Sequence, residues 1–140
     1  MVIVDILLKE KYGEVQDFYN TVGYLKKIEE GDRVIGAISQ NRIIGAARIS
    51  IEEDIFVLRG MQIALIFQRQ GVGTRILNEV NFLIERDVCW CISYQWLEDF
   101  YNRIGFKKVP ESQAPLFLQE RIAETRKTHP QIIMMVKNSK

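Results

Sequence analysis

The sequence is poor in the residues on which several kinds of site depend. It has one histidine and two cysteines in 140 residues, so a metal site of the usual ligand count cannot be assembled, and we expect no metal. Cys89 and Cys91 lie two apart in an apolar run. On a strand they would point to the same face, where they cannot readily form a disulfide. We expect buried free thiols in a reducing compartment.

An excess of charge of one sign is also missing, and so is a long hydrophobic run. The 19 basic side chains oppose 18 acidic ones and are mixed with them along the chain, whereas a nucleic-acid-binding protein would normally show a basic stripe. No uncharged apolar stretch approaches the roughly 20 residues that a membrane span needs. Asp5 interrupts the apolar N-terminus, which is therefore no signal peptide. We expect a cytoplasmic protein that binds neither nucleic acid nor membrane.

What is present fits one globular domain over residues 1–140, with 47% hydrophobic and 26% charged residues. Hydrophobic periodicity changes several times along the chain, between the period of a strand and that of a helix. The expected strands are 1–8, 33–39, 42–51, 55–66, 88–94, 106–109 and 132–136, and the expected helices are 15–22, about three turns after Gly73, 97–104 and 115–127. This order predicts an α/β fold in which helices cover the faces of a mixed sheet.

The most informative segment is the glycine loop, residues 68–74, which stands between an apolar strand and an amphipathic helix. A strand that turns through glycines into a helix directs unpaired N–H groups and the helix dipole toward one point, which suits a phosphate. A Walker loop would need a lysine after Gly73, and a dinucleotide fingerprint would need a third small residue where Ile76 stands. A plain strand-to-helix turn remains the alternative on these residues alone.

Two motifs resemble those of the GNAT superfamily of acyl-CoA-dependent N-acyltransferases. Gln68-x-x-Gly71-x-Gly73 resembles its [R/Q]-x-x-G-x-[G/A] signature, and Phe100 to Phe106 resembles its F-Y-x-x-x-G-F landmark. The resemblance covers nearly the whole chain and implies a mostly antiparallel central sheet with helices on both faces. It also implies transfer of an acetyl group from acetyl-CoA to a primary amine of a small molecule, amino acid or peptide, by direct attack in a ternary complex.

The resemblance further implies roles for particular residues. The strand before the loop would splay from its neighbour and pair its backbone with the pantetheine arm, the pyrophosphate would bind the loop, and the phenol of Tyr101 would protonate the departing thiolate. The N–H of the splayed strand near Ile63 would stabilise the oxyanion. The implied cofactor-binding residues are Met61, Gln62, Ile63, Gln68, Arg69, Gln70, Gly71, Val72, Gly73 and Thr74.

A general base and the acceptor are harder to predict. The expected strand 55–66 has no carboxylate, which leaves as candidate bases a water chain to bulk solvent or the side chains of Glu52, Glu53, Glu98 and Asp99. Arg59 of this strand would share a face with Val57 and Met61. A guanidinium there would suit a carboxylate-bearing acceptor, and pairing with the acidic turn Glu52 to Asp54 has at least equal weight. The missing carboxylate keeps open a second hypothesis, a non-catalytic domain that binds or senses acyl-CoA. The sequence leaves the oligomeric state open, a homodimer included.

Overall fold

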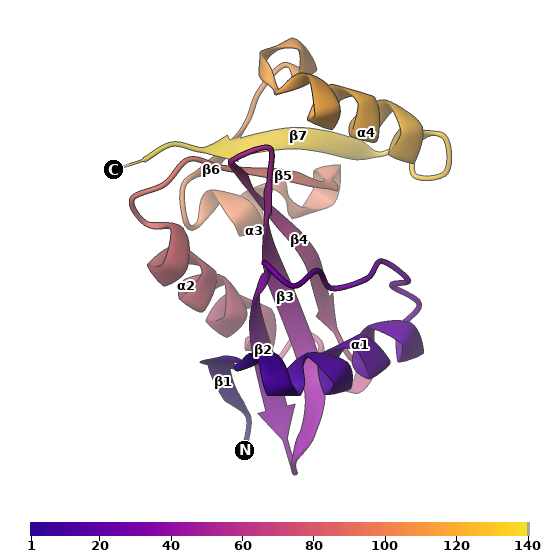
Figure 1. The fold of residues 1–140 in the computed structure, drawn as a ribbon, viewed down its shortest axis with the longest axis vertical. Helices are drawn as coiled ribbons and strands as arrows, with labels where there is room; N and C mark the ends of the chain where they lie inside the picture. The colour runs from indigo at the N-terminus through magenta and orange to yellow at the C-terminus, as the bar shows by residue number, and fades with distance from the viewer. Residues whose placement is uncertain (140) are drawn as a thin grey trace.

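The protein is described from a computed structural model, which covers residues 1–139. It contains one seven-stranded sheet of order β1-β2-β3-β4-β5-β7-β6, in which only β4 and β5 pair in parallel (Figure 1). The strands are β1 (Ile3–Ile6), β2 (Arg33–Ser39), β3 (Arg42–Glu52), β4 (Ile55–Ile63), β5 (Cys89–Tyr94), β6 (Phe106–Lys108) and β7 (Ile132–Lys137). The main helices are α1 (Tyr12–Thr21), α2 (Val72–Ile84), α3 (Glu98–Asn102) and α4 (Leu116–Arg126). The predicted mixed α/β fold is confirmed.

Helices cover both faces of the sheet, because alternate strand residues are apolar on each side. One face packs against α2 and α3 and forms the largest buried cluster, with Ile76, Leu77 and Tyr101 contributed by the helices. On the opposite face, α1 packs over β2 and β3, and α4 packs over β4, β5 and β7. Figure 1 shows α1 and α2 on opposite sides of the sheet, with α4 at the far end from α1.

Two tight hairpin turns connect β2 to β3 and β3 to β4 in the first half of the sheet. Gln40 and Asn41 have φ values of 51° and 62°, which forms a two-residue turn in the gap between the predicted strands 33–39 and 42–51. Glu53 and Asp54 repeat this geometry with φ values of 51° and 62°. Positive φ at both central residues matches the twist of the flanking strands. Glu52 therefore belongs to the end of β3 and not to the turn.

The end of β4 differs from the prediction. The strand stops at Ile63, and residues Leu65–Phe67 form a single 3₁₀ turn. Leu65 and Ile66 are 81% and 78% exposed, so this apolar run, in which hydrophobic and polar residues hardly alternate, is not part of a strand buried on both faces. An apolar run without alternation does not distinguish a doubly buried strand from an exposed apolar loop.

A bulge in β4 also changes which face its side chains occupy. The register with β3 shifts so that Ala47 stands opposite both Gly60 and Met61, and Gly60 has a φ of 67°. Such an extra residue reverses the alternation beyond it. Arg59 consequently shares the α1/α4 face with Val57, whereas Met61 packs against the α2 cluster. The prediction that Arg59 and Met61 share a face is wrong.

Glycine is required at this bulge by its surroundings as well as by its backbone. The Tyr19 hydroxyl of α1 donates a 2.8 Å hydrogen bond to the Gly60 carbonyl. A Cβ at Gly60 would lie 2.7 Å from the Tyr19 oxygen, closer than such contacts allow. The hydrogen bond thus fixes the bulge to the first helix.

The remaining features of the fold concern buried polar groups. Cys89 and Cys91 are buried free thiols on the α2 face, as predicted. Lys137 is 1% exposed, and its ammonium donates to the carbonyls of Ile84, Glu85, Asp87 and Asn138 at 2.8–3.3 Å. This lysine satisfies the C-terminal carbonyls of α2, which the helix itself leaves unpaired. Among residues 1–139, no helix has the length and apolar content that crossing a membrane requires.

Candidate functional site

An open seam runs between β4 and β5. The two strands pair only from Phe56 to Leu58 on one side and from Cys89 to Cys91 on the other. Beyond these pairs, β4 continues as far as Ile63 and stays paired with β3, and β5 continues as far as Tyr94 and stays paired with β7. The facing edges of the two strands therefore separate and present main-chain N–H and C=O groups that have no partner across the seam. Met61, Gln62 and Ile63, predicted to bind the pantetheine arm, all lie on this edge.

The glycine loop stands at the mouth of this seam, where the chain passes from β4 into α2. Gly71 is the N-terminal flanking residue of α2, with a φ of 83°, and Arg69 has a φ of 62°. The N–H groups of the first helical turn, at Val72, Gly73 and Thr74, have no acceptor within the helix. A Cβ added at Gly71 would meet no atom within 4 Å, so the space above the loop is free. The loop fits a diphosphate in charge, direction and space.

Two predicted binding residues also hold the loop together. The Gln68 side chain donates a 2.9 Å hydrogen bond to the Ile63 carbonyl, and the Gln70 side chain donates one of 2.9 Å to the Ile66 carbonyl. These bonds fasten the loop to the end of β4 and its 3₁₀ turn. The side-chain amides of Gln68 and Gln70 thus stabilise the conformation of the loop, to which the main-chain groups of both residues also belong.

Arg103 joins the second motif to the loop, and the sequence analysis missed it. Its guanidinium donates a 2.7 Å hydrogen bond to the Thr74 hydroxyl and lies 5.8 Å from the centre of the Phe100 ring. Arg103 is exposed, so it adds an accessible positive charge beside the N-terminus of α2. The only sequence signal was its place inside the Phe100–Phe106 motif, and a contact between segments so far apart in sequence cannot be read from spacing.

Tyr101, the predicted acid, lies at the closed end of the seam. The residue is 4% exposed and packs with Phe100 and Phe106 in edge-to-face contacts. Burial, and then the neighbouring Cys91 thiol, raise the pKa of Tyr101 well above its usual range. Cys91 is the last β5 residue that pairs with β4, and it belongs to the same buried cluster as Tyr101.

The hydroxyl of Tyr101 is nevertheless not sealed off. Among residues 1–139, two polar side-chain atoms are buried from solvent and lack a hydrogen-bond partner, Arg48 Nε and Asn81 Oδ1. The Tyr101 oxygen also forms no hydrogen bond among residues 1–139. Because it is not among these buried atoms, it keeps contact with solvent. A phenol of this kind is protonated at neutral pH and can donate to a group in the seam.

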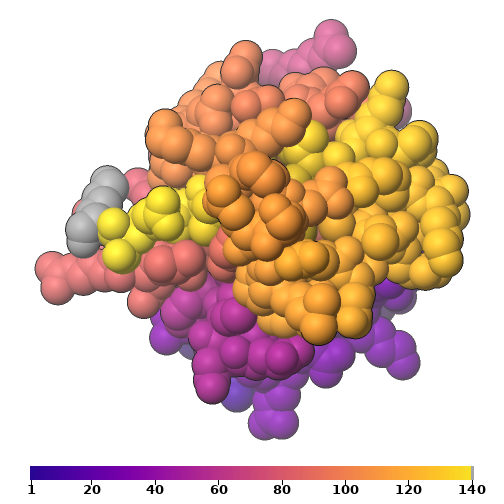
Figure 2. Space-filling model, turned by 90° about the horizontal axis from the view of Figure 1, so that it is seen from above, coloured from indigo at the N-terminus to yellow at the C-terminus, as the bar shows by residue number. Residues whose placement is uncertain are grey.

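On the opposite face of the sheet, Arg59 and its neighbours form a charged cluster. Glu52 accepts hydrogen bonds from both terminal nitrogens of Arg121 and a 2.7 Å bond from the Ser50 hydroxyl. The Arg59 guanidinium approaches the same carboxylate only to 3.7 Å. Figure 2 shows this end of the molecule, where the orange surface of the α4 segment lies beside the magenta surface of the β3–β4 hairpin.

The Glu52 carboxylate is poorly suited to act as a base. Burial alone would raise its pKa, but hydrogen bonds from Arg121 and Ser50 outweigh burial, and the pKa of Glu52 is lowered overall. A carboxylate held in this way has little affinity for a proton at neutral pH. Strand β4 itself offers no carboxylate.

A second arginine on this face is buried and bonded through its two terminal nitrogens. Arg48 is 1% exposed and donates a 2.8 Å hydrogen bond to Asp32 and a 3.1 Å bond to the Tyr24 hydroxyl. Asp32 also accepts the N–H of Glu29 at 2.9 Å. The pair closes the segment between α1 and β2 over the sheet. The sequence analysis missed it, because the spacing of isolated charges does not reveal a buried ion pair.

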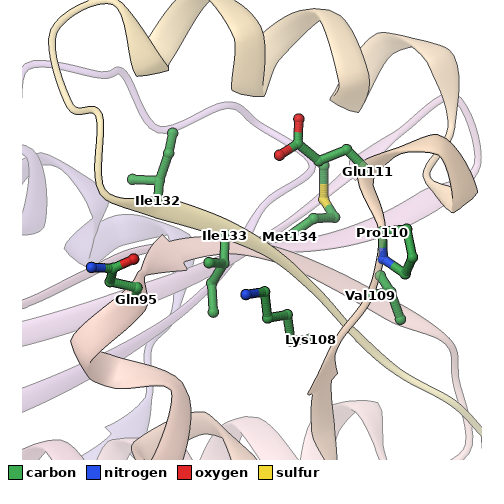
Figure 3. A pocket seen from close by; sticks show the side chains of 8 residues that line it. All are labelled: Gln95, Lys108, Val109, Pro110, Glu111, Ile132, Ile133 and Met134. Carbon is green, nitrogen blue, oxygen red and sulfur yellow. The ribbon is translucent and has the colours of Figure 1, made fainter.

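A pocket of about 520 Å³ lies elsewhere, beyond β7 as seen from the seam (Figure 3). It opens where β6 leaves β7, and its wall includes Lys108, Glu111 and Met134. Glu111 is paired with Arg126 at 2.5 Å. The pocket contains neither loop residues nor Tyr101 nor Arg59, so it is separate from the candidate site.

The seam, the glycine loop and the sheet order together define a class of mixed-sheet fold in which an open strand edge leads to a glycine loop at the start of a helix. A family model described as "Acetyltransferase (GNAT) domain" matches residues 7–115. The chain therefore belongs to the GNAT acetyltransferase family. Comparison with proteins of curated function gave no sequence match.

Solved structures show the same fold. Escherichia coli ElaA is 14% identical with a TM-score of 0.72, and the match covers 99% of this chain and 100% of that one. Arabidopsis thaliana Naa50, bound to the bisubstrate analogue CoA-Ac-MVNAL, is 13% identical with a TM-score of 0.66 and 98% coverage of both chains.

A third similar structure is N-acetylglutamate synthase from Neisseria gonorrhoeae, in complex with coenzyme A and N-acetyl-glutamate. It is 13% identical with a TM-score of 0.69, and the match covers 98% of this chain and 35% of that one. Identities this low establish the fold alone. Membership in the family makes acyl-CoA-dependent acyl transfer the general activity of the fold, and the acceptor is a separate question.

Proposed function

We propose that the protein transfers an acetyl group from acetyl-CoA to an amine by direct attack within a ternary complex. The observation that carries this proposal is the open β4–β5 seam leading to the glycine loop. Its unpaired strand edge at Met61–Ile63 suits the amides of a pantetheine arm, and the first turn of α2 suits a diphosphate. Arg69 and Arg103 add positive charge beside the loop.

The proposed chemistry assigns two tasks to this chain. The amine nitrogen forms a bond to the thioester carbon, and the carbon–sulfur bond breaks. An N–H of the β4 edge near Ile63 stabilises the negative charge on the carbonyl oxygen, and the Tyr101 hydroxyl gives its proton to the departing thiolate. The proton lost by the amine passes to solvent water, since β4 carries no carboxylate and Glu52 is held by Arg121. The Tyr101 phenolate takes up a proton from solvent water, which restores the acid.

The test combines binding with turnover. Calorimetry with acetyl-CoA measures binding, and release of free thiol in the presence of a panel of amines measures transfer above hydrolysis. Thiol release that depends on the amine supports the proposal. Absence of acetyl-CoA binding by the folded protein would refute it.

Replacing Gly73 by Ala separates loop function from loop stability. The added Cβ would lie 3.5 Å from Phe100, an ordinary contact, and alanine favours a helix by up to about 1 kcal/mol. We expect a melting temperature that is unchanged or higher, with acetyl-CoA affinity lowered about tenfold or more, because a methyl group blocks close approach of phosphate to the main chain. Unchanged affinity by calorimetry would contradict the proposed phosphate site.

A domain that binds acyl-CoA without turnover is the second candidate. The absence of a carboxylate on β4 and the strong pairing of Glu52 with Arg121 favour it. Saturable acetyl-CoA binding with no amine-dependent thiol release across the panel would support this candidate over the enzyme.

A further inference from the structure

We propose that the acceptor carries a carboxylate group beside its amine, as an amino acid does, and that the Arg59 guanidinium binds this carboxylate. The proposal rests on the proposed function, because it names the acceptor of that reaction. Its evidence lies in the hydrogen bonds, charge and position of Arg59.

Arg59 has unused hydrogen-bonding capacity. Its side chain is 22% exposed, and its one ion-pair contact among residues 1–139, to Glu52 at 3.7 Å, is too long for a hydrogen bond. It donates no side-chain hydrogen bond within this range, although a guanidinium has five N–H donors. None of its nitrogens is among the side-chain atoms that are buried from solvent without a hydrogen-bond partner, so a ligand can reach them. A largely buried guanidinium with accessible N–H donors gains most from an anion that can accept hydrogen bonds from them.

Glu52 fills this role only in part. Both of its oxygens already accept from Arg121, and Ser50 adds a further bond to one of them. These bonds hold the carboxylate toward α4, at an ion-pair distance of 3.7 Å from Arg59. The neighbouring acidic residues of the turn, Glu53 and Asp54, form no ion pair among the described residues.

The local charge is unbalanced in favour of an anion. Arg48, Arg59 and Arg121 share this face with the two carboxylates of Asp32 and Glu52. Burial, and next the positive charge of Arg48, lower the pKa of Arg59. A bound carboxylate would remove this imbalance and could accept two parallel hydrogen bonds from the guanidinium.

Arg59 is also in the right place to orient an acceptor. It directly follows Leu58, the last β4 residue that pairs with β5, and directly precedes the Gly60 bulge. Its side chain lies on the α1/α4 face, between Arg48 and the Arg121 helix, while the loop and Tyr101 belong to the α2 face. An acceptor held there would approach the seam from the face opposite to α2, with its amine near the point where the strands part.

The experiment compares matched acceptors that differ only in the carboxylate. Each set contains an amino acid, its carboxamide and the decarboxylated amine, and thiol release gives kcat/KM for each with saturating acetyl-CoA. The wild-type protein should prefer at least one amino acid over its own carboxamide by about tenfold or more. Arg59→Gln should abolish that preference, Arg59→Lys should restore part of it, and calorimetry should find the same acetyl-CoA affinity in all three.

Arg126→Gln is the matched control. It removes an arginine from the same helix, whose partner is Glu111, and leaves Glu52 with Arg121, so it should keep the preference for amino acids. If Arg126→Gln and Arg59→Gln lose the preference equally, the preference does not depend on a contact with Arg59 and the proposal is overturned.

Failure of this proposal is distinguishable from failure of the proposed function. If carboxamides and plain amines react as well as amino acids, transfer stands and the carboxylate site is refuted. If no amine reacts, the carboxylate site is tested by comparing the binding of N-acetyl amino acids to the CoA-loaded protein with the binding of their carboxamides. Binding that requires both the carboxylate and Arg59 supports the site, and equal or absent binding of the two overturns it.

Discussion

Tyr101 combines two properties that a proton donor in this site needs. Its ring is fixed by Phe100 and Phe106, and its oxygen is in contact with solvent at the closed end of the seam. A rigid position keeps the donor aligned, and a raised pKa keeps it protonated. The same burial also describes a core tyrosine, so the role remains a prediction that needs a kinetic test.

Tyr101→Phe keeps the ring and removes only the hydroxyl. If Tyr101 protonates the thiolate, kcat falls about tenfold to a hundredfold while acetyl-CoA affinity stays the same. Because the pKa of Tyr101 is raised, wild-type kcat should show no decline with rising pH through the ordinary range of a phenol. Stopped-flow thiol release checks both expectations, and a full-rate Phe variant would remove Tyr101 from the mechanism.

At this scale, residues in local motifs could be predicted and residues that act through distant contacts could not. Gly71 and Gly73 follow from a pattern of a few neighbours, and so does Tyr101. Arg103 acquires its role through Thr74, and Arg48 through Asp32. These contacts depend on which strands become neighbours, information that single positions do not carry.

At the scale of elements, β4 shows where a periodic pattern misleads. The positions of the strands were predictable from alternation and from turn residues such as Gln40-Asn41. The bulge at Gly60 was not, because one glycine within a strand is also compatible with an unbroken ladder. Since side-chain direction reverses at a bulge, one unpredicted residue changed the predicted neighbours of Arg59 and Met61.

Helix α2 yields a prediction about stability. Lys137→Met would remove the donor from the buried bond to the Ile84 carbonyl and from the half-buried bonds to the Glu85 and Asp87 carbonyls, and we expect a loss of about 2 kcal/mol or more in the free energy of unfolding. Lys127→Met is the control, since its exposed pair with Glu124 should contribute less than about 1 kcal/mol. Denaturant titration measures both, and equal effects would contradict the capping role of Lys137.

At the scale of the whole molecule, the core contains several groups that bind their protons more tightly when folded. Burial raises the pKa of Cys89 from 9.0 to about 12, and it also raises the pKa values of Cys91, Tyr19 and Tyr101. In the unfolded chain these groups ionise near their ordinary values, about 8.5 for a thiol and about 10 for a phenol. Above these values the unfolded state binds fewer protons than the folded state, so stability falls as pH rises.

We therefore expect a constant melting temperature just below pH 8 and a progressive decrease from about pH 9 toward pH 12. Calorimetric scans across this range check the expectation. Cys89→Ala should reduce the slope between about pH 9 and pH 11, whatever its effect on stability at neutral pH. A melting temperature that stays level to pH 11 would show that the thiols do not remain protonated in the folded protein.

The position of β7 has a consequence for how the protein is made. β6 joins the sheet only through β7, and the second edge of β5 is also completed by β7. A nascent chain that has emerged from the ribosome as far as α4 can assemble β1 to β4, but its β5 still lacks β7, the neighbour on the side away from β4. The wall of the seam and the cover over Val57 are thus completed only when residues 132–137 have left the exit tunnel, after β1 to β4 have become able to pair.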